Sequence, residues 1–318
     1  MAVTDLARYR VESTGVQVRQ LLLQLGRYKL LYLMLLPGVI YFLIFRYWPI
    51  YGLVIAFKDY RALDGILGSP WVGLQNFQAL VDSPLFLRAV KNTFVISFLK
   101  LVIGFPPPII LALMLNEVRI MGFKRIVQTI SYLPHFLSWV IIYGLLVALL
   151  GPGRGLINQW IQNLGRDPIA FLTNPRWFIG IIVASEIWKE VGWGAIIYLA
   201  ALTTINPELY EAASMDGASR LRQIWHISLP GILPVILLLF RLRLGHVLDA
   251  GFDQIYILYN PLVYDTSDII DTWVFRNGIE QFRFSLATAA SFFKSVFGLL
   301  LLLGANQLAK RYAEQGIW

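Results

Sequence analysis

The sequence contains no cysteine and few charged residues, and each absence excludes a class of protein. Without cysteine, the chain has neither a disulfide framework nor a thiolate metal site. Charged residues make up 14% of the 318 residues, whereas a soluble domain carries roughly a quarter. No Gly-Lys pair occurs, so a P-loop of the form G-x-x-x-x-G-K-[ST] is excluded. We therefore expect a chain that faces lipid over much of its surface and does not bind ATP in the P-loop manner.

Chemistry that would mark an enzyme or a metal protein is also missing. His135, His226 and His246 are too scattered for a metal site, and no spacing of Ser, His and Asp suggests a catalytic triad. The formal net charge of +8 is explained by basic residues that flank membrane spans, so nucleic acid is not an expected partner. We expect no metal, no cofactor and no enzymatic activity on this chain itself.

The long apolar runs predict an all-α, polytopic membrane protein. A helix of about 20 residues crosses the hydrocarbon core of a bilayer. Six segments qualify: Leu30–Phe57, Thr93–Leu115, Ile126–Leu150, Trp177–Leu202, Leu229–Leu248 and Leu286–Leu308. Arg46 and Pro49 should tilt or break the end of the first, and prolines 106–108 should kink the second. The organisation expected is a lead-in at 1–29, a six-helix domain at 30–308 and a tail at 309–318.

An even number of spans places both termini on one side of the membrane. Short segments with Lys124, Arg125, Arg220 and Arg222 then lie on the same side as the termini, and such segments are typically cytoplasmic. The expected location is a bacterial inner membrane with both termini in the cytoplasm. The loop at about 205–228 would also be cytoplasmic.

That loop is the most specific feature of the sequence. Asn206 and Pro207 are suited to begin a helix, and Glu208 and Glu211 fall where the helix dipole favours negative charge. Gly217 permits a sharp turn into a second helix at 218–227. A polar helix between two spans should lie on the membrane surface, where a partner can contact it. The residues expected to make that contact are Glu211, Ala212, Ala213, Asp216 and Gly217.

The spacing E-A-A-x-x-x-G, followed by Ile227-Ser228-Leu229-Pro230, resembles the coupling loop of ABC importer permeases. Other stretches resemble binding-protein-dependent sugar permeases, most nearly those for alginate oligosaccharides: Leu36-Pro37-Gly38, residues 71–77, Asn92-Thr93, residues 130–136 and Tyr259-Asn260-Pro261. The resemblance implies a type I ABC importer permease fold. It also implies a homologous second permease, forming a heterodimer, two ATPase subunits that bind ATP and Mg, and an extracytoplasmic solute-binding protein.

Ionisable residues at membrane depth are costly and mark candidate substrate pathways. Basic ones outnumber acidic ones, which favours an anionic saccharide; a neutral pathway completed by the partner permease remains the alternative. Glu186, Lys189 and Glu190 are spaced so that they can pair on one helix face. Arg241 and Arg243 are two residues apart, and one of them is expected to pair with Asp249 or with another helix. The basic pathway candidates are Lys100, Lys189, Arg241, Arg243 and Lys294.

Aromatic rings that stack on sugar C–H faces complete the candidate pathway. They are Trp188, Trp193, Phe252, Tyr256 and Trp273. Two other classes of function stay open from the sequence. An ion-coupled carrier would use the buried charges but leave the Glu211 loop unexplained. A membrane-embedded enzyme would need a clustered site, for which the only candidate is Asp265, Asp268 and Asp271.

Overall fold

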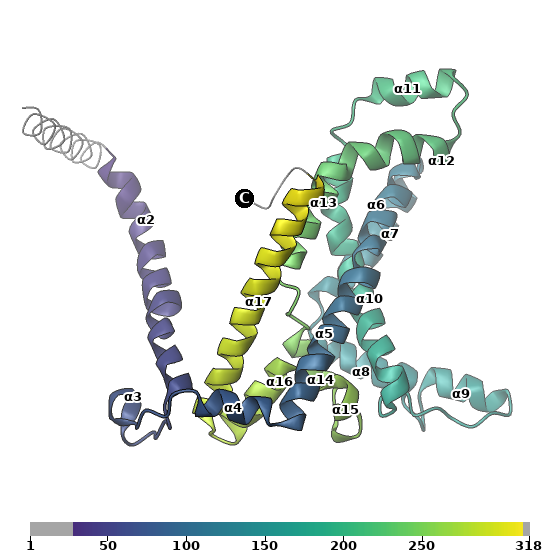
Figure 1. The fold of residues 1–318 in the computed structure, drawn as a ribbon. Coiled ribbons are helices and arrows are strands. Elements are labelled where there is room, and N and C mark those ends of the chain that lie inside the picture. Colours follow the sequence, from purple (N-terminus) through teal and green to yellow (C-terminus); the bar gives the residue numbers. More distant parts are fainter. Residues whose placement is uncertain (1–27, 314–318) are drawn as a thin grey trace, which may run out of the picture.

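The computed structural model describes residues 28–313, and these are almost entirely helical. Within that range no strand forms, and Lys58 and Trp71 make one isolated bridge. The all-α prediction is therefore confirmed. Most of the expected lead-in at 1–29 and the end of the expected tail lie outside the described residues. Figure 1 shows helix α2 (Lys29–Phe42) standing apart from a bundle that includes α17 (Phe284–Ala313).

Four helical segments of the described chain are long and apolar enough to cross a membrane. They are Lys29–Phe57, Pro84–Glu117, Arg220–Leu244 and Phe284–Gly304. A bent pair, Met121–Phe136 and Trp139–Leu150, would make a fifth. Helix α10 (Pro175–Leu202) is 28 residues long but carries Glu186, Lys189 and Glu190 at its centre, so it is not among the strongly apolar segments.

The first span changes its helix type near Arg46 and Pro49, where a tilt or break was expected, whereas the kink expected in the second span stays a prediction. After α2 the helix widens into a π turn, η1 (Leu43–Tyr47), and then tightens into the 3-10 segment η2 (Trp48–Phe57), which has Pro49 in its first turn. In the second span, α5 (Pro84–Gly104) gives way to α6 (Pro106–Glu117) at Phe105. Phe105 keeps helical dihedral angles, so the prolines begin a new helix along the same span.

The prediction of a continuous third span at 126–150 is wrong. Helix α7 (Met121–Tyr132) ends in the short 3-10 turn η3 (Leu133–Phe136), and α8 (Trp139–Leu150) leaves at 109° to it. Pro134 lies in the first turn of η3, and the Ser138 hydroxyl then caps α8 by accepting a hydrogen bond from the Ile141 N–H. A proline followed by an N-cap residue four positions later therefore breaks the apolar run.

Short helices gather at the end of the bundle opposite α11 (Figure 1). They are α3 (Gly65–Gly68), α4 (Gln75–Val81), α9 (Leu156–Asn163), α14 (Phe252–Leu258), η5 (Pro261–Val263), α15 (Tyr264–Ser267), α16 (Ile270–Phe275) and η6 (Arg276–Glu280). The other end carries α11 (Pro207–Met215), which is followed by α12 (Arg220–Gln223), η4 (Ile224–Ser228) and α13 (Leu229–Leu244).

Close helix contacts in the bundle depend on small residues. Ala112 of α6 and Ala195 of α10 are fully buried in one apolar cluster. A Cβ on Gly192 would overlap the backbone carbonyl of Ser131, and one on Gly194 would lie 3.1 Å from Pro108. Helix α10 is therefore held against both α6 and the end of α7, which makes it the central element of the bundle.

Candidate functional site

The loop between α10 and α13 forms an exposed helix at one end of the molecule (Figure 1). The Asn206 side chain accepts a hydrogen bond from the Glu208 N–H at 3.1 Å, so the predicted N-cap is confirmed. Gly217 has φ of +72°, the left-handed conformation that ends the helix. Of the five predicted contact residues, Glu211, Ala212, Asp216 and Gly217 are exposed and Ala213 is half-buried.

Two hydrogen bonds fix this exposed helix to the segment that follows it. The hydroxyls of Tyr210 in α11 and Ser228 in η4 lie 2.9 Å apart. The buried Gln223 amide donates to the Ser214 hydroxyl at 2.9 Å. The predicted helix at 218–227 is present from Arg220 and continues through the π turn η4 directly into α13, with Pro230 in the first turn of α13. Two side-chain hydrogen bonds therefore connect α11 to the helical segment that leads into α13.

Lys100 is the centre of a buried polar network. Its Nζ donates to Glu186 Oε2 at 2.8 Å, to the Ala250 carbonyl at 2.7 Å and to Gln254 Oε1 at 2.5 Å. Only 5% of Lys100 is exposed, so all three ammonium hydrogens are satisfied inside the protein. The network joins α5, α10 and α14.

Lys189 satisfies backbone groups rather than its neighbours in α10. Its Nζ donates to the carbonyls of Pro134, His135 and Leu137, where α7 and η3 end. Glu190 instead contacts His135 Nδ1 at 3.0 Å. The predicted ion pairing within α10 is therefore wrong, because Glu186 reaches Lys100 of α5, whereas Lys189 and Glu190 both reach η3 and the residue after it.

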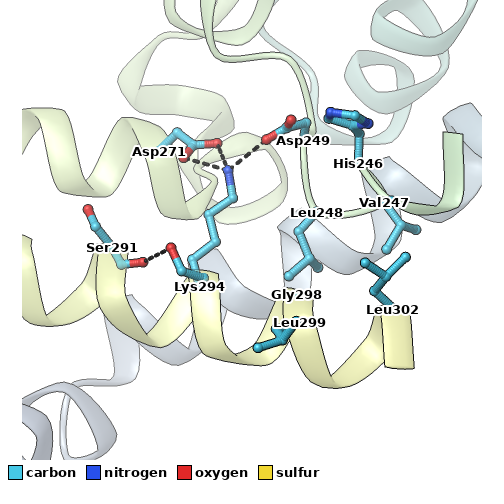
Figure 2. A pocket seen from close by; sticks show the side chains of 12 residues that line it. His246, Val247, Leu248, Asp249, Asp271, Ser291, Lys294, Gly298, Leu299 and Leu302 are labelled. Atoms are coloured by element: carbon cyan, nitrogen blue, oxygen red, sulfur yellow. Dashed lines mark hydrogen bonds and ion pairs between the residues drawn. The ribbon is translucent and has the colours of Figure 1, made fainter. Parts of the chain in front are cut away.

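Lys294 of α17 lines a cavity of about 440 Å³. Figure 2 shows its ammonium group pointing to Asp271 of α16 and to Asp249 in the connection between α13 and α14. The distances are 2.8 Å to both oxygens of Asp271 and 3.0 Å to one oxygen of Asp249. We expected Arg241 or Arg243 to pair with Asp249 or with another helix. Arg243 donates to the Lys100 carbonyl of α5 at 3.3 Å, which agrees with the second alternative.

The predicted aromatic candidates do not form one surface. Phe252 and Tyr256 stack with centroids 5.3 Å apart, and Phe252 lines a second cavity of about 400 Å³ beside Asp271. Trp273 is 3% exposed and packs against Phe86 in the core. Trp193 stacks on the His135 ring and lines a cavity of about 350 Å³ with Lys100, Arg243 and Glu186, while Trp188 is exposed.

The three aspartates that suggested an enzyme site are separated by their partners. Asp265 pairs with Arg88, Asp268 with Arg276 at 2.5 Å, and Asp271 with Lys294. Burial disfavours charge on Arg276, but its hydrogen bond and charge interaction with Asp268 raise the Arg276 pKa above its ordinary value. Among the described residues no group of three His, Asp or Glu side chains is arranged to hold a metal.

Several residues of these networks were not singled out from the sequence. Gln254 and Tyr210 carry no charge, and the sequence around each of them is typical of many helices. Asp271 was singled out only with Asp265 and Asp268 as a candidate enzyme site, and its ion pair with Lys294 was not predicted. The excess positive charge expected at membrane depth is offset here by Asp271.

Comparison with known proteins identifies the family of this chain. The family described as "binding-protein-dependent transport system inner membrane component" matches residues 104–314. The polygalacturonan/rhamnogalacturonan transport system permease protein YteP of Bacillus subtilis (strain 168) is 51% identical over 300 residues, which are 94% of each chain.

Two solved structures are similar over most of the chain. One is of a bacterial ABC transporter involved in the import of the acidic polysaccharide alginate; its matching chain is 47% identical, with a TM-score of 0.85, and 92% of this chain and 99% of that chain are covered. The other, a bacterial alginate ABC transporter in complex with alginate pentasaccharide-bound periplasmic protein, gives 46% identity, a TM-score of 0.84 and coverages of 92% and 98%. The chain belongs to the family of binding-protein-dependent transport inner membrane components, the permease subunits of ABC importers.

Proposed function

We propose that this permease forms part of the translocation pathway for acidic oligosaccharides. The observation that carries the proposal is the agreement between independent relatives. The protein that is 51% identical is named for polygalacturonan, a polymer of a sugar carboxylic acid, and the transporter that is 47% identical imports alginate, which is also acidic. A cavity with a lysine at its side, next to one lined by aromatic rings, supports a substrate with carboxylates and sugar rings.

The proposed machine contains several other chains. A homologous second permease, forming a heterodimer, would complete the pathway, and two ATPase subunits would hold ATP and Mg. An extracytoplasmic binding protein would deliver the sugar. The segment 30–308 would be the membrane domain, between a cytoplasmic lead-in at 1–29 and a cytoplasmic tail at 309–318. Glu211, Ala212, Ala213, Asp216 and Gly217 would contact the ATPase.

The mechanism proposed is alternating access, driven from α11. Closure of the ATPase subunits would push on α11, and its hydrogen bonds to η4 and α12 would carry the movement into α13. The pathway would open outward, accept the sugar, and open inward after ATP hydrolysis. An ion-coupled carrier would not need an exposed, capped helix at this end of the molecule.

The test is reconstitution of the complete transporter in proteoliposomes. ATP-dependent uptake is measured with binding protein loaded with an acidic or a neutral oligosaccharide. We expect uptake of the acidic sugar, and its loss with Glu211→Ala, because the exposed carboxylate is lost from α11. Uptake of neutral sugars alone would contradict the acidic substrate but keep the importer. Uptake without any ATPase subunit would contradict the coupling mechanism.

A further inference from the structure

Lys294 differs from the other two lysines among the pathway candidates in its exposure and in its two acidic partners. Lys100 and Lys189 are 5% and 8% exposed, and their donors are occupied by buried acceptors within the helix bundle. The Lys294 side chain is 17% exposed and lies at the wall of the cavity drawn in Figure 2. An incoming ligand can therefore reach this ammonium group without displacing a helix.

The two carboxylates that hold Lys294 differ in the strength of their attachment. Asp271 contacts the ammonium through both oxygens at 2.8 Å, and its side chain is 27% exposed. Asp249 contacts it through one oxygen at 3.0 Å, and its side chain is 61% exposed. An exposed, single-contact ion pair contributes little stability, whereas a bidentate and partly buried one contributes more. Asp249 is thus the replaceable partner.

Because of the charges on Lys294, Asp249 and Asp271, an incoming carboxylate has to replace one of the two aspartates rather than join them. One ammonium and two carboxylates carry a net charge of −1, so a third carboxylate would be repelled unless one of the first two left. If Asp249 turns into water as a sugar carboxylate arrives, the charge at Lys294 is unchanged. The same carboxylate can return and displace the sugar, which favours the weak, reversible binding that a transport pathway needs.

The surroundings of Lys294 suit a sugar ring attached to that carboxylate. Ser291 and Ser295 line the same cavity, and Ser291 and Asp271 also line the adjacent cavity. There Phe252, Phe275 and Phe284 provide aromatic surface. Hydroxyls beside an ion pair, next to aromatic rings, match the alternating polar and C–H surfaces of a saccharide.

We propose that Lys294 binds the carboxylate of an acidic sugar unit by exchange with Asp249, while Asp271 holds the ammonium group in place. This inference rests on the proposed function, since it assigns a site to the acidic substrate. It predicts opposite effects for two neutralising substitutions. Lys294→Gln removes the binding group, and Asp249→Asn removes its competitor while keeping the shape of the side chain.

The experiment is equilibrium dialysis with the complete complex of permease and ATPase subunits in lipid nanodiscs, without binding protein. The probes are a radiolabelled uronate trisaccharide and the same trisaccharide with its carboxyls reduced to alcohols. We expect D249N to bind the acidic probe about fivefold more tightly than the wild type, the factor that corresponds to an exposed ion pair. We expect K294Q to bind it more weakly, and K294R to restore binding.

The double variant D249N/K294Q separates competition from general disturbance. Competition predicts that D249N has no effect once Lys294 is gone, and that neither substitution changes binding of the reduced probe. Lys91→Gln, the same change at an exposed lysine of α5, is the matched control. The proposal is overturned if D249N binds the acidic probe no better than the wild type. The uptake assay decides the proposed function separately.

Discussion

At the scale of single residues, the buried charges of this permease are held by partners from other helices. Lys100 illustrates this arrangement, because its three acceptors come from α10, α14 and the connection before α14. An unpaired charge in such a place costs several kcal/mol, so the network has to stay complete. These contacts keep α5, α10 and α14 in register where apolar side chains alone would permit sliding.

Replacement of Lys100 by Met should leave Glu186 and Gln254 without their cation. We expect the free energy of unfolding to fall by about 3 kcal/mol, the usual cost of removing one partner from a buried ion pair. Thermal unfolding of the purified complex measures this effect. Lys91→Met on the exposed face of α5 is the control and should unfold near the wild-type temperature. Equal unfolding temperatures for both variants would contradict the structural role of the network.

Gly192 offers a second test at this scale. A methyl group there would overlap the Ser131 backbone, so Gly192→Ala should force α10 and α7 apart and destabilise the protein by about 1–3 kcal/mol. Gly180 lies in the same helix with open space around its Cα. Gly180→Ala is thus a matched control, and size-exclusion chromatography after heating compares the two. If both variants survive heating equally, the close contact is not required.

At the scale of elements, α11 is important because it is joined to α13 by side chains as well as by the chain itself. The hydrogen bond between Tyr210 and Ser228 connects α11 to the π turn η4, which leads into α13. Gln223 makes a second connection near the turn at Gly217. Two side-chain hydrogen bonds therefore hold the loop together, and we expect a force on its exposed face to move the loop as one unit.

Tyr210→Phe should remove the hydrogen bond to Ser228 without changing the exposed surface of α11. Loss of one hydrogen bond costs about 1 kcal/mol, which is small for stability but acts where movement is transmitted. We expect fewer sugar molecules transported per ATP hydrolysed in proteoliposomes. Tyr51→Phe removes a hydroxyl from an exposed ring of η2 and serves as the control. If the number of sugar molecules transported per ATP is unchanged in Tyr210→Phe, the hydrogen bond between Tyr210 and Ser228 does not carry the coupling.

Prediction from the sequence was most accurate where structure depends on neighbouring residues. The Asn206 cap, the α11 helix and the turn at Gly217 are set by short-range preferences, and each was expected. The bend after Phe136 was missed because hydrophobicity alone does not distinguish a straight span from a broken one. The partner of Lys100 in α10 was also missed, because contacts between distant segments leave no periodic pattern.

At the scale of the whole molecule, the described chain has two distinct ends. The loop that contains α11 lies at one end, and the short helices from α3 to α16 lie at the other (Figure 1). In the proposed orientation, the first of these ends would face the ATPases and the second would face the binding protein. The absence of cysteine makes this arrangement directly measurable, since no native thiol interferes.

Single cysteines should report the orientation by their access to a membrane-impermeant maleimide. Met215 at the end of α11 is 89% exposed, and Leu63 in the loop before α3 is fully exposed. We expect Met215→Cys to react only in inside-out vesicles and Leu63→Cys only in right-side-out vesicles. The cysteine-free parent should not react in either. Reaction of both variants from one side would contradict the proposed topology.

The separation of α2 from the bundle has a consequence for synthesis. None of the residues of α2 is buried, so this helix can enter the bilayer as soon as the ribosome releases it. The segment η2, which follows η1, packs against α17, which is translated more than 200 residues later. A nascent chain that stops before α17 would therefore be anchored in the membrane but not assembled. The surface of η2 would stay open until α17 has been made.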